Sequence, residues 1–215
     1  MPEPSPGDAP LAKSVPVSGS AIRVEFTHLA NLGTTTRAGA IDPATGENVL
    51  RIVFGSGRGS VLHEAAMPPF VVAPLRGTIR VIDGHCTRLL RSRRLFVAEQ
   101  GGNLQIVGGM SALWIAVIAS ASLWRRLFEA TADAPMSSPI LLTAAHAADP
   151  PILRAMIRAV RAAADEGAGR IDAINAAMGI AARLAELQAS FDACIDRCPG
   201  RTQAQRRAVF SRLQR

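Results

Sequence analysis

Seven short apolar runs between residues 21 and 120 constrain the fold of this chain most strongly. Each is four to six residues long, and Gly, Pro or Asp residues separate it from the next. Runs of this length and spacing are typical of all-β sandwiches and barrels. The runs are Ile22–Phe26, Val49–Phe54, Phe70–Ala73, Thr78–Ile82, Leu95–Ala98, Asn103–Val107 and Trp114–Ile118. We predict an antiparallel β-barrel of the jelly-roll kind, because closing a sheet removes its exposed edges.

Two of these runs show the alternation of a strand with one buried and one solvent-exposed face. In Val49–Val53 and in Thr78–Ile82 a single arginine interrupts the apolar residues. Since successive side chains on a strand point to opposite faces, we expect Arg51 and Arg80 to face solvent. Glycine-rich residues 55–59 lie between runs, where a turn is expected.

The pattern becomes helical after residue 120. Residues 123–128 predict a short helix, and the Pro150-Pro151 pair predicts the start of a second. From Ile171 to Ile195, apolar residues recur at helical spacing and predict a long amphipathic helix. Its apolar face needs a partner, which the barrel, the preceding helix or a second copy of the chain would each supply. The fold class expected from both halves is α+β.

The composition gives the net charge of the protein and indicates where it is located. The chain has 215 residues, 48% of them hydrophobic, and a net charge of +7 that comes from 24 basic residues, with Lys13 the sole lysine. A GC-rich coding sequence explains this excess of arginine as well as selection for phosphate binding does, and a basic surface favours nucleic acid or acidic partners. Residues 1–20 are rich in proline and predict a disordered leader without signal-peptide features. The chain has three cysteines, which together with the lack of signal-peptide features predicts a cytoplasmic protein. The longest apolar run, residues 112–123, is too short to span a bilayer, so we expect no membrane partner.

The last part of the chain resembles the region before and into the first DNA-binding helix of AraC-type transcriptional regulators. The resemblance lies in residues 171–175, in Cys198-Pro-Gly-Arg-Thr202 and in residues 206–215, where Val209, Phe210 and Leu213 have helical spacing. Residues 97–106 and 112–118 look like strands of the cupin-type sensory domain that such regulators often carry.

This resemblance implies a domain plan and partners. Residues 21–120 would form an antiparallel cupin-like β-barrel that binds a small-molecule effector, and residues 121–198 would form an α-helical linker and dimerisation region of a homodimer. Residues 199–215 would begin a truncated DNA-binding domain, so DNA would be bound only through C-terminal helix-turn-helix units missing from this chain.

The predicted sites follow from this plan. Large or charged residues on the expected strands are the candidates for effector binding: Phe54, Phe70, Arg80 and Trp114. Apolar residues of the long helix are the candidates for dimerisation: Ile174, Met178, Leu184, Leu187 and Phe191. We expect a protein that is not an enzyme and has no catalytic residue, cofactor or metal.

The alternative is a stand-alone cupin enzyme that acts on a small metabolite, or a small-metabolite-binding protein. Such a barrel commonly binds a metal through closely spaced histidines and a carboxylate. The pairs His63-Glu64 and His85-Cys86 do not chelate one ion from a single strand, because adjacent residues point to opposite faces. A site formed by His63 and His85 across two strands remains open.

Two further clusters have ordinary structural explanations. Cys194 and Cys198 are one helical turn apart, but two thiols without another ligand form an incomplete site. Arg88, Arg91 and residues 93–94 form the densest charge cluster of the β region. They are expected at a solvated hairpin tip, with an anion-binding pocket as the alternative.

Overall fold

The architecture was established from a computed structural model, which describes residues 22–30, 35–37, 48–58, 60–64, 70–83, 86–98, 104–131, 144–147, 149–165 and 169–196. The predictions for the leader and for residues 199–215 lie outside these ranges. The strands are β1 (Arg23–Ala30), β2 (Thr35–Arg37), β3 (Val49–Ser56), β4 (Val61–Glu64), β5 (Phe70–Arg76), β6 (Thr78–Asp83), β7 (Cys86–Arg91), β8 (Arg94–Ala98), β9 (Leu104–Gly108), β10 (Leu113–Ala119) and β11 (Ala144–Ala147). The helices are α1 (Ala121–Thr131), α2 (Pro150–Ala164) and α3 (Gly169–Asp196).

The strands form two sheets in the order expected of a jelly roll. The large sheet has the order β1-β3-β10-β5-β8-β11, and the small sheet has the order β2-β4-β9-β6-β7. The eight strands β3 to β10 are divided between the two sheets in the orders 3-10-5-8 and 4-9-6-7, with antiparallel neighbours throughout. This order is that of a double-sheet jelly roll built from two Greek keys.

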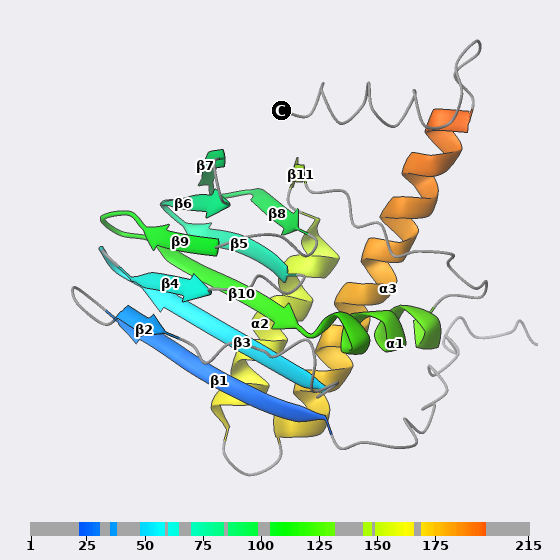
Figure 1. Cartoon of the computed structure of the whole chain (residues 1–215), viewed down its shortest axis with the longest axis horizontal. Coiled ribbons are helices and arrows are strands. Elements are labelled where there is room, and N and C mark those ends of the chain that lie inside the picture. Colours follow the sequence, from blue (N-terminus) through cyan, green and yellow to red (C-terminus); the bar gives the residue numbers. More distant parts are fainter. Residues whose placement is uncertain are drawn as a thin grey trace, which may run out of the picture.

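The prediction of an antiparallel barrel needs two corrections. The described strands form two separate sheets rather than one closed barrel, and both sheets are mixed. Strands β1 and β2 run parallel to β3 and β4, and each lies at an edge of its sheet. The α+β class itself is confirmed, because the described residues also form three helices, all of them after β10 (Figure 1).

All seven predicted strands are present, and four further strands were missed. The missed strands are β2, β4, β7 and β11, of which β2, β4 and β11 have only three or four residues. Strand β7 contains Thr87, Arg88 and Arg91 among its six residues, which hides its alternation. Strand β11 lies inside the region predicted to be helical and pairs with β8.

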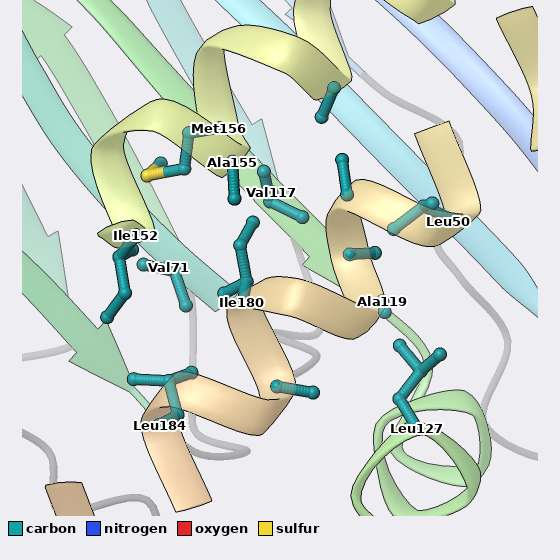
Figure 2. Close-up of a cluster of buried hydrophobic side chains, with 14 of the residues drawn as sticks. Leu50, Val71, Val117, Ala119, Leu127, Ile152, Ala155, Met156, Ile180 and Leu184 are labelled. Carbon is teal, nitrogen blue, oxygen red and sulfur yellow. The ribbon is translucent and has the colours of Figure 1, made fainter. Parts of the chain in front are cut away.

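An outer core joins the large sheet to the helices. It is formed by the face of the sheet that carries Leu50, Ile52 and Val117, together with buried residues of all three helices. Figure 2 shows Met156 of α2 and Ile180 of α3 gathered with Val117 of the sheet. The helices therefore cover one face of the large sheet, and α2 packs along α3 (Figure 1).

An inner core fills the space between the two sheets. It includes Val53, Phe70 and Trp114 from the large sheet, and Val81 and Leu104 from the small sheet, all without exposed surface. The large sheet is thus covered on both faces, whereas the small sheet has one face in solvent. Strand β9 shows this directly, since its residues alternate between buried and half-buried along its length.

Capping residues fix where α1 and α2 begin. The Ser120 hydroxyl accepts a hydrogen bond from the backbone N–H of Leu123 at 3.3 Å, which ends β10 and starts α1. The Asp149 carboxylate accepts one from the N–H of Ile152 at 3.2 Å, just before the predicted Pro150-Pro151 start. Arg183 of α3 binds the same carboxylate at 3.0 Å, so the two helices are tied together at this end.

The predicted helices are confirmed in number and place. Residues 123–128 lie in α1, the proline pair opens α2, and residues 171–195 lie in α3. Among the described residues, no helix combines the length and the apolar character that crossing a bilayer requires.

Candidate functional site

A buried arginine on the inner face of β3 is the most unusual feature of the sandwich. Val49 and Val53 of this strand belong to the inner core, and Leu50 and Ile52 belong to the outer core. Arg51 lies between them with 4% of its surface exposed. Since strand residues alternate, its side chain lies on the same face as Val49 and Val53. The prediction that Arg51 faces solvent is therefore wrong.

The partner of Arg51 comes from the neighbouring edge strand. Glu25 of β1 is paired in register with Arg51, and Ile118 of β10 is its partner on the other side. The Nε–H of Arg51 donates to Oε2 of Glu25 at 3.0 Å, while the second carboxylate oxygen accepts from Arg23. The side chains of Arg51, Glu25 and Arg23 are 5%, 27% and 63% exposed. The three residues form a row from the interior of the sandwich to solvent.

The two arginines set the charge of Glu25. Burial by itself raises the pKa of this carboxyl, but hydrogen bonds and charge attraction from Arg23 and Arg51 outweigh burial, and the pKa lies below its ordinary value of 4.5. Glu25 is therefore ionised at neutral pH. The row carries two positive charges and one negative charge.

We expect this carboxylate to make stability depend on pH in the acid range. Because the pKa is lowered by folding, the unfolded chain binds more protons, so the stabilisation is complete above the ordinary value of 4.5 and is lost as pH falls through the folded pKa. Urea unfolding of the wild type and of Glu25→Gln should therefore give stabilities that converge as the pH is lowered. A matched change at exposed Glu129 of α1 should leave the wild-type pH dependence in place, and a difference between wild type and Glu25→Gln that stays constant would contradict the prediction.

Two of the four residues predicted to bind an effector lie between the sheets. Trp114 and Phe70 are both fully buried in the inner core. The indole N–H of Trp114 donates to the hydroxyl of Ser60 at 2.9 Å, and the ring lies over Gly55 on the neighbouring strand. Gly55 was expected in a turn but belongs to β3. Both aromatic residues are core residues here, and their role in binding stays a prediction.

The other two lie elsewhere, so the structure does not bring the four together. Phe54 is half-buried on the helix side of the large sheet, with its ring tilted by 32° to that of His28 and 5.3 Å between the ring centroids. Arg80 is exposed on the outer face of the small sheet, because its neighbours Ile79 and Val81 occupy the inner core. Neither side chain reaches the inter-sheet interior.

The dimerisation candidates are largely used within the chain. Leu184 is buried in the outer core at 5% exposure, and Ile174, Met178 and Leu187 are half-buried against the same core. Leu184 is therefore not available to a second copy. The side chain of Phe191 lies outside the described part of α3, and the homodimer itself stays a prediction. Ile171, which was not among the candidates, is 70% exposed.

The enzymatic alternative receives no support from the described residues. Within them, no group of three or more His, Cys, Asp or Glu residues is placed to hold a metal ion. His85 and Cys198 lie outside the described ranges, and the side chains of His63 and Cys194 do as well. The absence of enzymatic activity therefore remains an expectation.

The four arginines of the predicted charge cluster lie in the β7–β8 hairpin, but in two different environments. Arg91, Arg93 and Arg94 are exposed at the turn, where Arg93 has a positive φ of 69°. This arrangement agrees with the predicted hairpin tip. Arg88 differs, because its guanidinium lies 5.2 Å from the ring centre of the buried Phe96.

Comparisons with known proteins give weak similarities at the level of structure. No protein-family model and no curated protein sequence matches the chain. A structure of apo ToxT K231A from Vibrio cholerae is 5% identical, with a TM-score of 0.45 over 66% of this chain and 57% of that one. A putative ethanolamine utilization protein Q from Salmonella typhimurium is 12% identical, with a TM-score of 0.29 over 34% and 58%. A cupin-2 domain protein from Shewanella frigidimarina is 13% identical, with a TM-score of 0.26 over 33% and 68%.

These similarities extend over part of each protein. The chain matches 57% of the length of ToxT and 58% of the length of the Salmonella protein. ToxT is also similar in a structure with a bound unsaturated fatty acid, at a TM-score of 0.37. At these scores the resemblance to AraC-type regulators depends on the sequence motif of residues 198–215, and membership stays a prediction.

Proposed function

We propose that this chain is the ligand-binding part of an AraC-type transcriptional regulator, without catalytic activity of its own. In this proposal the jelly roll binds a small organic anion at Arg51, and the helices transmit the binding. The observation that carries the proposal is the burial of Arg51 at 4% exposure among apolar residues of the inner face.

Energetic considerations favour a functional reason for this arginine. The free-energy cost of moving two charges out of water offsets most of the attraction between them. A buried ion pair is therefore often no more stabilising than well-packed apolar residues. The Arg51–Glu25 pair is thus a poor choice for stability alone. A guanidinium offers several N–H donors in a fixed plane, which suits recognition of a carboxylate or phosphate.

The surroundings of Arg51 define the class of ligand. On the inner face its neighbours include Val49 and Val53 along the strand and Ile118 across it. A ligand seated here therefore needs an anionic group for Arg51 and an apolar body for these side chains. We expect a carboxylate ligand to take the place of Glu25, whose side chain is 27% exposed and can turn toward solvent and Arg23.

Displacement of Glu25 provides a route from the ligand to the helices. Glu25 belongs to the edge strand β1, which pairs with β3 and also contacts α2 and α3. Val24, the next residue in β1, packs against the outer core. A ligand that breaks the Arg51–Glu25 pair changes the position of β1 only to the extent that it binds the two arrangements with different affinity.

Thermal unfolding with a panel of carboxylates tests this proposal. The panel should include benzoate, octanoate and oleate, each with its neutral amide as control, and the protein should be the wild type and the double variant Arg51→Met/Glu25→Leu. We expect at least one carboxylate to raise the Tm of the wild type, with no effect of its amide and no effect on the double variant. An equal shift in the double variant, or no shift by any panel member, would argue against Arg51 as the binding group.

The transcriptional part of the proposal is tested separately in the organism. Genes whose transcript levels respond to the active carboxylate in the wild-type strain should lose that response in a strain that carries the double variant. A response that persists unchanged would separate the ligand site from regulation, and ligand binding without any change in transcription would favour a metabolite-binding protein instead.

A further inference from the structure

Helix α2 carries two parallel stripes that the ligand-binding proposal does not use, one exposed to solvent and one half-buried at the edge of the outer core. Arg154, Arg158 and Arg161 form the basic stripe, and Leu153, Ile157 and Val160 form the apolar stripe. Both sets have the spacing i, i+4, i+7, so each lies along one line of the helix. Each apolar residue is adjacent in sequence to an arginine.

The basic stripe has no acidic partner in the described chain. Its three arginines are exposed and make no ion pair or hydrogen bond with a described residue. Residues 150–164 contain no Asp or Glu. Like charges at i, i+4 on a helix repel one another, so this arrangement slightly destabilises α2 by itself. A partner with negative charge would remove that repulsion.

The apolar stripe lies beside the basic one on the flank of α2 that turns away from α3. Ala155 marks the opposite flank, because a Cβ added to Gly179 of α3 would lie 4.0 Å from its Cβ. At about 100° per residue, Ile157 lies roughly 160° around the helix from Ala155. Leu153, Ile157 and Val160 pack partly against the outer core, and the half-buried remainder of each side chain is accessible beside the arginines.

We propose that α2 is a docking surface for an acidic amphipathic helix of a partner protein. A partner that is complementary to the two stripes has acidic and apolar residues in adjacent lines at the same spacing. Each stripe extends over about 10 Å of the helix axis. Charge complementarity favours this occupant over a second copy of the chain, since a symmetric contact would place α2 against an identical arginine stripe. DNA phosphates would satisfy the arginines but would leave the apolar stripe unused.

A designed peptide provides the test. The probe is a fluorescent 18-residue helix with Leu at i, i+4 and i+7 and Glu next to each Leu, and a scrambled peptide of the same composition is its control. Anisotropy titration measures Kd for the wild-type chain and for Arg154→Gln/Arg158→Gln/Arg161→Gln. The matched control is Arg91→Gln/Arg93→Gln/Arg94→Gln, which removes the same charge from exposed residues of the β7–β8 hairpin.

The expected result is specific to α2 and to the pattern of the peptide. The α2 variant should bind the probe at least tenfold more weakly than the wild type, the hairpin variant should remain within about twofold, and the scrambled peptide should bind the wild type at least tenfold more weakly. Because all six arginines are exposed, neither variant should lower the Tm, and the α2 variant should raise it slightly by removing the repulsion between like charges.

Other outcomes would overturn the proposal. An equal loss of affinity in the hairpin variant would show that the peptide responds only to the net charge of the protein. Equal binding of the scrambled peptide would show that the apolar stripe does not contribute to the interface. Tighter binding of a random 20-base-pair DNA duplex, or of vesicles with 30% anionic lipid, that depends on the α2 arginines would assign the stripe to nucleic acid or to a membrane surface. Self-association that is lost in the α2 variant would assign it to a second copy. None of these results depends on the ligand at Arg51.

Discussion

Replacing Gly55 with alanine is expected to lower the free energy of unfolding by about 3 kcal/mol or more, at the upper end of what overpacking costs. A Cβ at this position would lie 1.9 Å from Cε2 of Trp114. Trp114 is fully buried between the sheets and is held by its hydrogen bond to Ser60, so it cannot move aside without breaking that bond. Urea unfolding followed by tryptophan fluorescence measures the effect.

Gly179 provides a matched control with the opposite sign. It lies within α3, where a Cβ would meet Ala155 only at the ordinary contact distance of 4.0 Å. Glycine inside a helix is less favourable than alanine by about 1 kcal/mol, so Gly179→Ala should stabilise the protein. If Gly55→Ala is as harmless as Gly179→Ala, the packing of Trp114 over β3 is wrong.

A double-mutant cycle assigns the effect to this contact. Trp114→Ala alone should cost about 3–5 kcal/mol through loss of a large buried side chain. In the Trp114→Ala background the alanine at position 55 meets no indole, so the additional cost of Gly55→Ala should largely disappear. Equal costs in both backgrounds would place the strain of Gly55→Ala elsewhere.

Removing one partner of the buried ion pair is expected to give the second large effect. Glu25→Leu removes the carboxylate that accepts a hydrogen bond from the buried Nε–H of Arg51, which should cost about 3–5 kcal/mol. Arg51→Met should cost less, because Glu25 is 27% exposed and keeps its bond to Arg23. Chemical denaturation at neutral pH compares the two single variants.

The double variant distinguishes a functional pair from a structural one. Arg51→Met/Glu25→Leu replaces both charges with apolar side chains and should recover most or all of the stability lost in Glu25→Leu. Full recovery together with loss of carboxylate binding is the result expected of a pair that serves recognition. A double variant as unstable as Glu25→Leu would mean that the pair is needed for the fold itself.

The burial pattern of the strands explains which predictions succeeded. The apolar runs located every long strand of the large sheet, and the alternation in Thr78–Ile82 correctly placed Arg80 in solvent. The same reasoning failed for Arg51, because β3 is covered by the small sheet on one face and by helices on the other. In Val49–Val53 all residues except Arg51 are apolar, and a strand apolar on both faces has no solvent side.

Other parts of the site were beyond reach of the sequence. The partner Glu25 lies 26 residues before Arg51 on a strand that pairs in parallel, and sequence periodicity does not specify such pairing. Strands β2, β4 and β11 are too short for a clear period. The face of Phe54 follows from its even position relative to Leu50 and Ile52, but only the three-layer arrangement shows that this face turns to the helices.

The central claim is that a small organic anion binds to the guanidinium of Arg51. The most direct test is NMR of protein labelled with ¹⁵N-arginine, in which the Nε–H of Arg51 is identified by its loss in Arg51→Met. Its burial and its hydrogen bond to Glu25 should protect this proton from exchange. Titration with the carboxylate that raises the Tm should shift the Arg51 signal to saturation, while the signals of exposed Arg91 and Arg154 stay in place. Saturable binding that leaves the Arg51 signal unchanged would contradict the account.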